Sequence, residues 1–123
     1  MDRLTVKAGL RAYKHIDEDI RQKLEFAKAA EDGKQYEREA EELRNVKREF
    51  IRCLNELPQL ERDCIWRHYV NGEMWVRIST KYAYSERQIR NIAARGLDRL
   101  GKGISLRAVL KRFFQGAKQG FSH

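Results

Sequence analysis

Apolar side chains recur every three or four residues along most of the chain, a period that predicts amphipathic helices. Asp32-Gly33 interrupts the pattern, and glycine is costly inside a helix but favoured just beyond its end. The first apolar stripe consists of Leu10, Tyr13, Ile16, Ile20, Leu24 and Ala27, and the second of Tyr36, Ala40, Leu43, Val46, Phe50, Leu54 and Leu57. The pattern therefore predicts two helices joined near Gly33, arranged as an antiparallel hairpin or as one long coiled-coil arm.

Each of these two helices alone would expose an apolar stripe to water, so each needs a partner. The partner is the other helix, the second half of the chain or a second copy of the chain. A three-four stripe serves intramolecular packing and homodimerisation equally well. We therefore expect residues 1–56 to form a helical region that dimerises or binds a partner.

Three shorter helices are predicted between Leu57 and Leu100. Pro58 is tolerated in the first turn of a helix that we expect to reach Val70, and Asn71-Gly72 then signals a turn. A short helix should follow from about Glu73 to Tyr82. The apolar positions expected to face inward in these two helices are Leu60, Cys64, Ile65, Tyr69, Trp75, Ile78 and Tyr82.

The third helix is predicted to begin at Ser85, whose hydroxyl can cap the first turn after a tight connection at Ala83-Tyr84. Its buried stripe would be Ile89, Ile92, Ala93, Leu97 and Leu100, which leaves Glu86, Arg87, Gln88, Arg90, Asn91 and Arg95 on the other face. A helix, a short turn and a helix exposing Arg, Gln and Asn form the arrangement that a DNA-binding helix-turn-helix requires.

The charge distribution favours the same interpretation. The 123 residues carry 26 Lys and Arg against 18 Asp and Glu, a net charge of +8. Residues 1–56 hold 13 basic and 13 acidic side chains, whereas residues 57–123 hold 13 basic and 5 acidic ones. The whole positive excess therefore lies in the half that contains the predicted helix-turn-helix, where it can attract nucleic acid.

The segment from Ser85 to Leu100, SERQIRNIAARGLDRL, resembles the recognition helix of region four of bacterial sigma factors. Upstream, Leu57-Pro58-Gln59-Leu60-Glu61-Arg62 followed by Ile65, Tyr69 and Gly72 is similar to the family's preceding helix and turn. Downstream, residues 105–114 are similar to its last helix. The resemblance covers roughly residues 46–115 and implies an all-α fold that binds double-stranded DNA.

Two departures from the sigma pattern narrow what the resemblance implies. The chain has Glu86 then Arg87 where primary sigma factors have Arg then Glu, so a different base preference is expected from the usual promoter −35 sequence. No sigma region two is present, so a complete sigma factor is not expected. A helical N-terminal part joined to a region-four-like part resembles phage transcriptional regulators of the ArpU and RinA type.

The candidate DNA-binding residues lie on or just before the third helix. Arg87, Gln88 and Asn91 have the side chains that bond base edges in a major groove, and Arg90 and Arg95 are expected to bind phosphates. Glu86 is a weaker base-contact candidate because a carboxylate repels phosphate. Lys81 on the preceding helix and the cap Ser85 complete the set.

The remainder of the chain, residues 104–123, is predicted to be an amphipathic helix with a tail. Leu106, Val109, Leu110, Phe113 and Phe114 would lie opposite the basic residues Arg107, Lys111 and Arg112. Such a helix packs on its own domain or on a partner. By resemblance to sigma region four, RNA polymerase is one candidate partner.

Several function classes are not expected. No apolar run approaches the ~20 residues of a membrane span, and the mixed-charge N-terminus does not resemble a secretory signal. Cys53 and Cys64 form no CxxC pair, which favours a reducing, cytoplasmic compartment in a bacterial host. Cys64 and His68 have ligand spacing but lack further ligands nearby, so we expect no metal, no cofactor and no enzyme activity.

Three functional hypotheses follow from these patterns. The first is a phage or prophage transcriptional regulator that reads the major groove with the helix starting at Ser85. The second is a sigma-like module that binds RNA polymerase or another host protein without specific DNA recognition. The third is a small phage packaging protein that assembles through its helical half.

Overall fold

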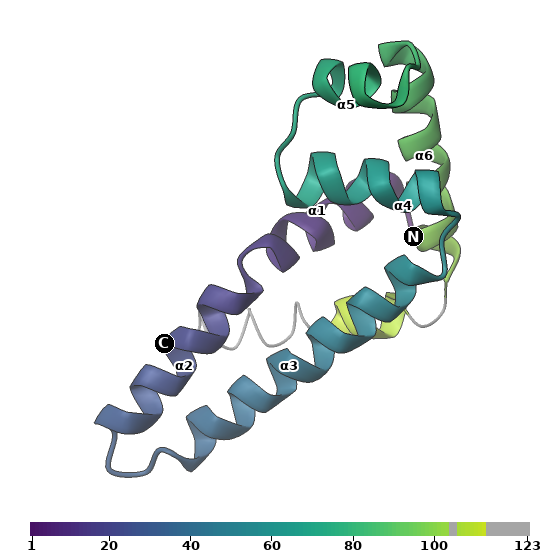
Figure 1. The fold of residues 1–123 in the computed structure, drawn as a ribbon. Helices are drawn as coiled ribbons and strands as arrows, with labels where there is room; N and C mark the ends of the chain where they lie inside the picture. Colours follow the sequence, from purple (N-terminus) through teal and green to yellow (C-terminus); the bar gives the residue numbers. More distant parts are fainter. Residues whose placement is uncertain (104–105, 113–123) are drawn as a thin grey trace.

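The computed structural model describes residues 1–103 and 106–112, and every regular element in those ranges is helical, which confirms the all-α class. Predictions that fall on Ser105, Phe113, Phe114 and the tail after them lie outside the described residues. The helices are α1 (Arg3–Lys14), α2 (Ile16–Ala29), α3 (Lys34–Asn55), α4 (Gln59–Ile65), the π-helix η1 (Trp66–Val70), α5 (Trp75–Tyr82) and α6 (Glu86–Lys102). Residues 106–112 are helical as well (Figure 1).

Helices α2 and α3 form the antiparallel hairpin, which projects from the remainder of the molecule (Figure 1). Two ion pairs join them, Lys47 Nζ to Asp17 Oδ1 at 2.6 Å and Lys23 Nζ to Glu39 Oε2 at 2.7 Å. The turn between them needs glycine, because a β-carbon on Gly33 would collide with the carbonyl oxygen of Ala27. The predicted break at Gly33 is therefore confirmed.

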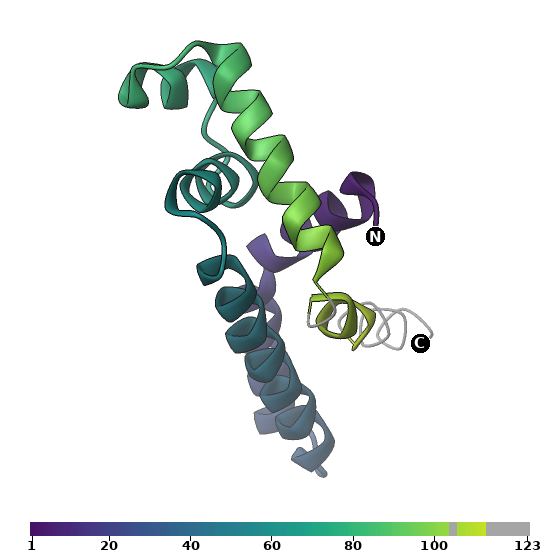
Figure 2. The ribbon, with the colours of Figure 1, turned by 90° about the vertical axis from the view of Figure 1, so that its right-hand side faces the viewer.

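The prediction of one helix from Leu10 to Ala27 is wrong, because the chain bends at His15 between α1 and α2. The His15 N–H bonds back to the carbonyls of Ala12 and Tyr13, which closes α1. The charges flanking the bend favour two helix ends: Arg11 and Lys14 lie in the last turn of α1, and the first turn of α2 holds Asp17, Glu18 and Asp19. Helix α1 therefore leaves the hairpin and packs on α6 and η1 (Figure 2).

The predicted helix from Pro58 to Val70 is present as two segments. Helix α4 ends at Ile65, and η1 continues it with a wider turn in which the Asn71 N–H bonds the Trp66 carbonyl at 2.9 Å. Cys64 and Ile65 are buried as expected. Leu60 and Tyr69 are half-buried, and the turn at Gly72 has the positive φ of 74° that favours glycine.

One hydrophobic core connects the hairpin, α1 and the α4–α6 region. Its centre is aromatic: the Tyr13 ring stacks on Phe50 at 4.8 Å between centroids and meets Trp66 edge-on at 5.7 Å. Helical residues 106–112 pack beneath α1, where a β-carbon on Gly9 would clash with Leu110. Leu106, Val109 and Leu110 are buried, whereas Arg107, Lys111 and Arg112 are exposed.

Candidate nucleic-acid interface

Helices α5 and α6 are joined by a tight turn at residues 83–85. Ala83 adopts the left-handed conformation with φ of 56°, which ends α5 after Tyr82. The Tyr84 N–H then donates to the Ser79 carbonyl at 3.1 Å, and this bond fixes the direction in which the chain enters α6. The predicted tight connection at Ala83-Tyr84 is confirmed.

Ser85 is the N-cap of α6, as predicted, and forms a capping box with Gln88. The Gln88 N–H donates to Ser85 Oγ at 3.1 Å, and the Ser85 N–H donates to Gln88 Oε1 at 2.9 Å. The side-chain carbonyl of Gln88 is therefore engaged within the first turn. Bidentate recognition of adenine by Gln88 would require it to leave this cap.

The buried and exposed faces of α6 follow the predicted stripe. Ile89, Ile92, Ala93, Leu97 and Leu100 are all buried, together with Gly96 and Gly101. Gly96 permits close packing, because a β-carbon there would lie 2.5 Å from Ile65 Cδ1 on α4 and that side chain would have to move. The other candidates on this helix, Glu86, Arg87, Gln88, Arg90, Asn91 and Arg95, are exposed along its first three turns.

Arg90 lies on the flank of α6 that faces α5 and η1. Its guanidinium pairs with Glu86 Oε1 at 2.8 Å and sits over the Trp75 ring at 5.8 Å. Trp75 stacks on His68 with ring centroids 3.6 Å apart, and His68 Nδ1 donates to the Glu73 carbonyl at 2.8 Å. Trp75 is thus a packing residue that also supports a cation, as expected from its inward position.

The opposite flank of α6 borders a shallow groove against α4. The groove has a volume of about 410 Å³ and is lined by Pro58, Leu60, Glu61, Tyr84, Gln88, Asn91, Ile92, Arg95 and Arg99. Arg99 Nε bonds Glu61 Oε1 at 3.1 Å, and Glu61 is 7% exposed at the base of the groove. Both flanks of α6 therefore carry arginine side chains.

Lys81 lies in the last turn of α5, close to the turn that leads into α6, and its side chain is exposed. Within the described residues it takes part in no ion pair, and the same holds for Arg87 and Arg95. The turn and α6 thus bring together every predicted site residue, from Lys81 to Arg95, at one end of the molecule.

A second group of basic residues was missed by sequence reasoning. Helix α1 carries Arg3, Lys7, Arg11 and Lys14 and no acidic residue, although residues 1–56 as a whole are neutral. Arg3 forms two bonds with Asp98 on α6, at 2.7 and 2.8 Å, which holds the pKa of that carboxyl below its ordinary value. Lys7 Nζ lies over the Tyr69 ring at 5.9 Å. The signal in the sequence is the stretch from Arg3 to Lys14, which holds four basic residues and no acidic one.

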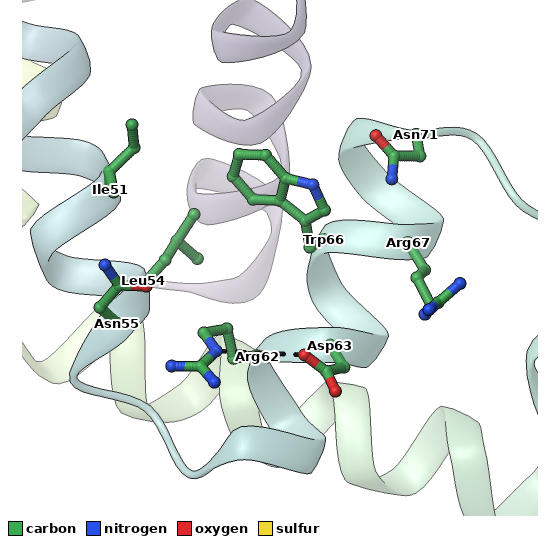
Figure 3. A pocket seen from close by; sticks show the side chains of 8 residues that line it. All are labelled: Ile51, Leu54, Asn55, Arg62, Asp63, Trp66, Arg67 and Asn71. Atoms are coloured by element: carbon green, nitrogen blue, oxygen red, sulfur yellow. Dashed lines mark ion pairs between the residues drawn. The ribbon is translucent and has the colours of Figure 1, made fainter. Parts of the chain in front are cut away.

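A separate pocket of about 420 Å³ lies between α3 and the α4–η1 segment, and no residue of α6 lines it (Figure 3). Trp66 points into it with Ile51 and Leu54 nearby, and Arg62 and Asp63 form an ion pair at its rim. Trp66 is half-buried. The pocket combines an apolar floor with side chains of both charges, so its chemistry does not single out one ligand class.

The remaining chemical candidates are buried or isolated. Cys53 and Cys64 are free thiols in the core, and burial raises the pKa of Cys64 to about 11. Among the described residues no three metal-ligating side chains gather in one place. No helix in that part of the chain is both long enough and apolar enough to cross a membrane.

No protein-family model, curated protein or solved structure matches the chain. The fold and the surface nevertheless define a class of molecule in structural terms. It is an all-α protein in which a capped helix, α6, presents an exposed and largely basic N-terminal face between two supporting helices.

Proposed function

We propose that the chain is a sequence-specific, DNA-binding transcriptional regulator that inserts the N-terminal half of α6 into a major groove. The observation that carries the proposal is the exposed face of α6 between α4 and α1, on which Arg87, Asn91 and Arg95 are unpaired within the described residues. A major groove about 12 Å wide admits one helix, with a phosphate backbone on either side. Arginines on both flanks of α6 match those two backbones.

Individual roles follow from position and from the partners each side chain already has. Arg87 and Asn91 face outward and are assigned to base edges, where Arg bonds guanine and Asn bonds adenine. Arg95 and Arg90 lie on opposite flanks and are assigned to phosphates, with Glu86 and Trp75 orienting Arg90. In this proposal Lys81 binds a phosphate at the edge of the site, and Ser85 and Gln88 hold the first turn.

Selection from random duplex DNA with purified protein at moderate salt tests this proposal. Wild-type protein should enrich one motif, and Asn91→Ala should relax the preference at one position at a cost of about 1–3 kcal/mol. Asn45→Ala, an exposed substitution on α3, is the matched control and should change neither affinity nor motif. If wild-type protein enriches no sequence, the proposal is wrong.

The biological setting is proposed from the resemblance to phage regulators of the ArpU and RinA type. In that setting the chain acts in the cytoplasm of a bacterial host on phage or prophage genes, with RNA polymerase as a second partner. Homodimerisation is proposed through the α2–α3 hairpin, whose far end carries Phe26, 53% exposed, against Tyr36. Sedimentation of Phe26→Ser beside wild type tests the dimer, since the variant should be monomeric.

A protein-binding module is the second candidate, and exposed apolar side chains favour it. Met74 is 69% exposed and Val76 52% exposed at the start of α5, next to the proposed DNA surface. If this surface binds RNA polymerase or another host protein, Met74→Ser with Val76→Ser should abolish capture of purified polymerase. This double variant should keep both its DNA affinity and its capture of polymerase unchanged if the protein binds DNA and not polymerase.

A further inference from the structure

We infer that the basic flank of α1 is a second DNA-contacting surface, which binds the phosphate backbone beside the groove that α6 enters. This inference rests on the proposed function, because it names a further part of the same partner. The surface consists of Lys7, Arg11 and Lys14, which recur at helical spacing and so share one side of α1. Arg3 shares that side but is already paired with Asp98.

We place the flank beside the proposed DNA site because α1 packs on α6 and η1 and its basic side chains lie near both elements and the turn at Gly72. The Arg3–Asp98 pair ties its first turn to α6, and Lys7 Nζ lies over the Tyr69 ring of η1 at 5.9 Å. At the other end, Lys14 Nζ lies 3.7 Å from the position that a β-carbon on Gly72 would take. The flank therefore runs from α6, along η1, to the turn that precedes α5.

A continuous series of aromatic and cationic side chains links this flank to the N-terminal half of α6. Lys7 lies over Tyr69, and the Tyr69 ring meets Trp75 edge-on at 5.9 Å. Arg90 in turn lies over the Trp75 ring at 5.8 Å. Burial raises the pKa of Tyr69, and the positive charges of Arg11, Arg3 and Arg90 oppose that rise. Basic side chains from α1 and α6 thus act on one half-buried tyrosine, which Lys7 contacts directly.

These cations are available to a ligand. Lys7, Arg11 and Lys14 take part in none of the ion pairs formed within residues 1–103 and 106–112, whereas most arginines of α2 and α3 are paired along their own helices. Arg11 and Lys14 are exposed and Lys7 is half-buried. A cluster of unpaired cations is electrostatically costly alone, and a polyanion relieves that cost.

The dimensions fit a DNA strand. At 1.5 Å per residue, the axis of α1 from Lys7 to Lys14 spans about 10 Å. One strand of B-DNA presents a negative charge every 3.4 Å along the helix axis, so a flank that runs along that axis can reach up to three phosphates. Because phosphate contacts fix register without reading sequence, the flank should add affinity and leave base preference unchanged.

The test uses the full-length triple variant Lys7→Gln, Arg11→Gln, Lys14→Gln and the duplex that wild type enriches. The matched control is Lys28→Gln, Lys34→Gln, Arg38→Gln, which removes the same charge from exposed, unpaired positions at the far end of the hairpin in the described chain (Figure 1). Circular dichroism and thermal unfolding verify that both variants fold. Sedimentation verifies that both keep the oligomeric state of wild type, because the control residues lie near Phe26 and Tyr36 of the proposed dimer surface. Fluorescence anisotropy between about 50 and 300 mM salt then gives affinity and salt dependence.

The α1 variant should lower the slope of log affinity against log salt by about 0.9 for each phosphate that it no longer binds, and by about 2.7 for three phosphates. Taking equal affinity at 1 M salt, the variant should bind about 8-fold more weakly than wild type at about 0.1 M salt when one phosphate contact is lost. The difference should reach about 500-fold when three contacts are lost. The hairpin control should bind within about twofold of wild type. The enriched motif should be the same for all three proteins.

Replacing single phosphates with neutral methylphosphonates separates direct contact from a general charge effect. Wild type should lose affinity at two or three flanking positions, and the α1 variant should be insensitive at those same positions. If the α1 variant keeps wild-type affinity and slope, or if the hairpin control weakens binding equally, the inference is wrong while the proposed function stands. If wild type binds no duplex at all, both are wrong.

Discussion

The capping box of α6 can be tested by removing its two side chains separately. Ser85→Ala removes the oxygen that accepts the Gln88 N–H at 3.1 Å, and Gln88→Ala removes the oxygen that accepts the Ser85 N–H at 2.9 Å. Loss of an N-cap serine costs about 1 kcal/mol, within a range of about 0.5–2. Loss of the reciprocal, exposed bond from Gln88 should cost about 0.5–1 kcal/mol.

These free energies convert into measurable shifts in unfolding. An unfolding entropy of about 2.1 cal/mol/K per residue gives a chain of 123 residues about 0.26 kcal/mol/K, so 1 kcal/mol lowers Tm by about 4 °C. The double variant should lose less than the sum of the single losses, because both bonds close the same turn. Guanidinium chloride unfolding followed by circular dichroism measures each of the three free energies.

Two controls decide what the cap does. The free energy of unfolding of Ser85→Asp should lie within about 0.5 kcal/mol of the wild-type value, because aspartate caps equally well and adds a favourable charge at the helix N-terminus. Thr80→Ala removes an exposed hydroxyl bonded to the Val76 carbonyl inside α5, and this replacement should be neutral. Unchanged stability in Gln88→Ala together with an altered DNA motif would show that Gln88 reads a base instead of holding the turn.

Three further predictions concern strain, protonation and burial. Ala83→Gly should raise the free energy of unfolding by up to about 1 kcal/mol, because Ala83 has φ of 56°, a conformation that glycine adopts without strain. Ala94→Gly, inside α6, should instead lower the free energy of unfolding by about 0.5–1 kcal/mol. Chemical denaturation of both variants tests these opposite signs. Burial lowers the pKa of His68 below 6.5, the Glu73 carbonyl opposes that shift, and nearby Arg90 and Lys7 add to it. As the pH falls from 7.5 to 5.5, His68 therefore takes up a proton in the unfolded chain before it does so in the folded protein, and the free energy of unfolding should fall. His68→Gln should reduce this dependence of the free energy of unfolding on pH. The thiols of Cys53 and Cys64, whose pKa values are raised by burial, should react with a thiol reagent only on unfolding, and prompt labelling of the native protein would contradict their burial.

The parts of the fold that the sequence predicted are those in which local signals agree. Along α6 the apolar period, the serine cap and the preceding turn all indicate the same start and the same buried face, and the structure has both. The break at Gly33 was predictable because glycine disfavours a helix interior. In the structure the same glycine also permits a close approach to Ala27. Where the apolar period, the cap residue and the turn residue agree, a single sequence is enough to predict the element.

The bend at His15 and the π-turn at Trp66 were missed because neither disturbs the apolar period. Tyr13, Ile16 and Ile20 keep steps of three and four across the bend, so the stripe looks continuous, although α1 packs mainly on α6 and η1 whereas α2 packs on α3. The one local signal is the change from basic to acidic side chains across His15. At the start of η1, Trp66 meets Tyr13 of another helix edge-on, a contact that no local pattern encodes.

The missed bend changes how the charge of the molecule is arranged. Residues 16–56, which form the hairpin and its link to α4, carry nine basic and twelve acidic side chains, so the apparently neutral half of the sequence is an acidic arm plus the wholly basic α1. A continuous helix would have kept α1 on that arm, where its cations would offset the acidic residues. The bend instead places α1 beside α6 and leaves the acidic arm pointing away (Figure 2). A polyanion would therefore be attracted to the end that carries α1 and α6 and repelled from the hairpin. On a bound polyanion the hairpin would point away from the ligand, where a second protein molecule can reach it.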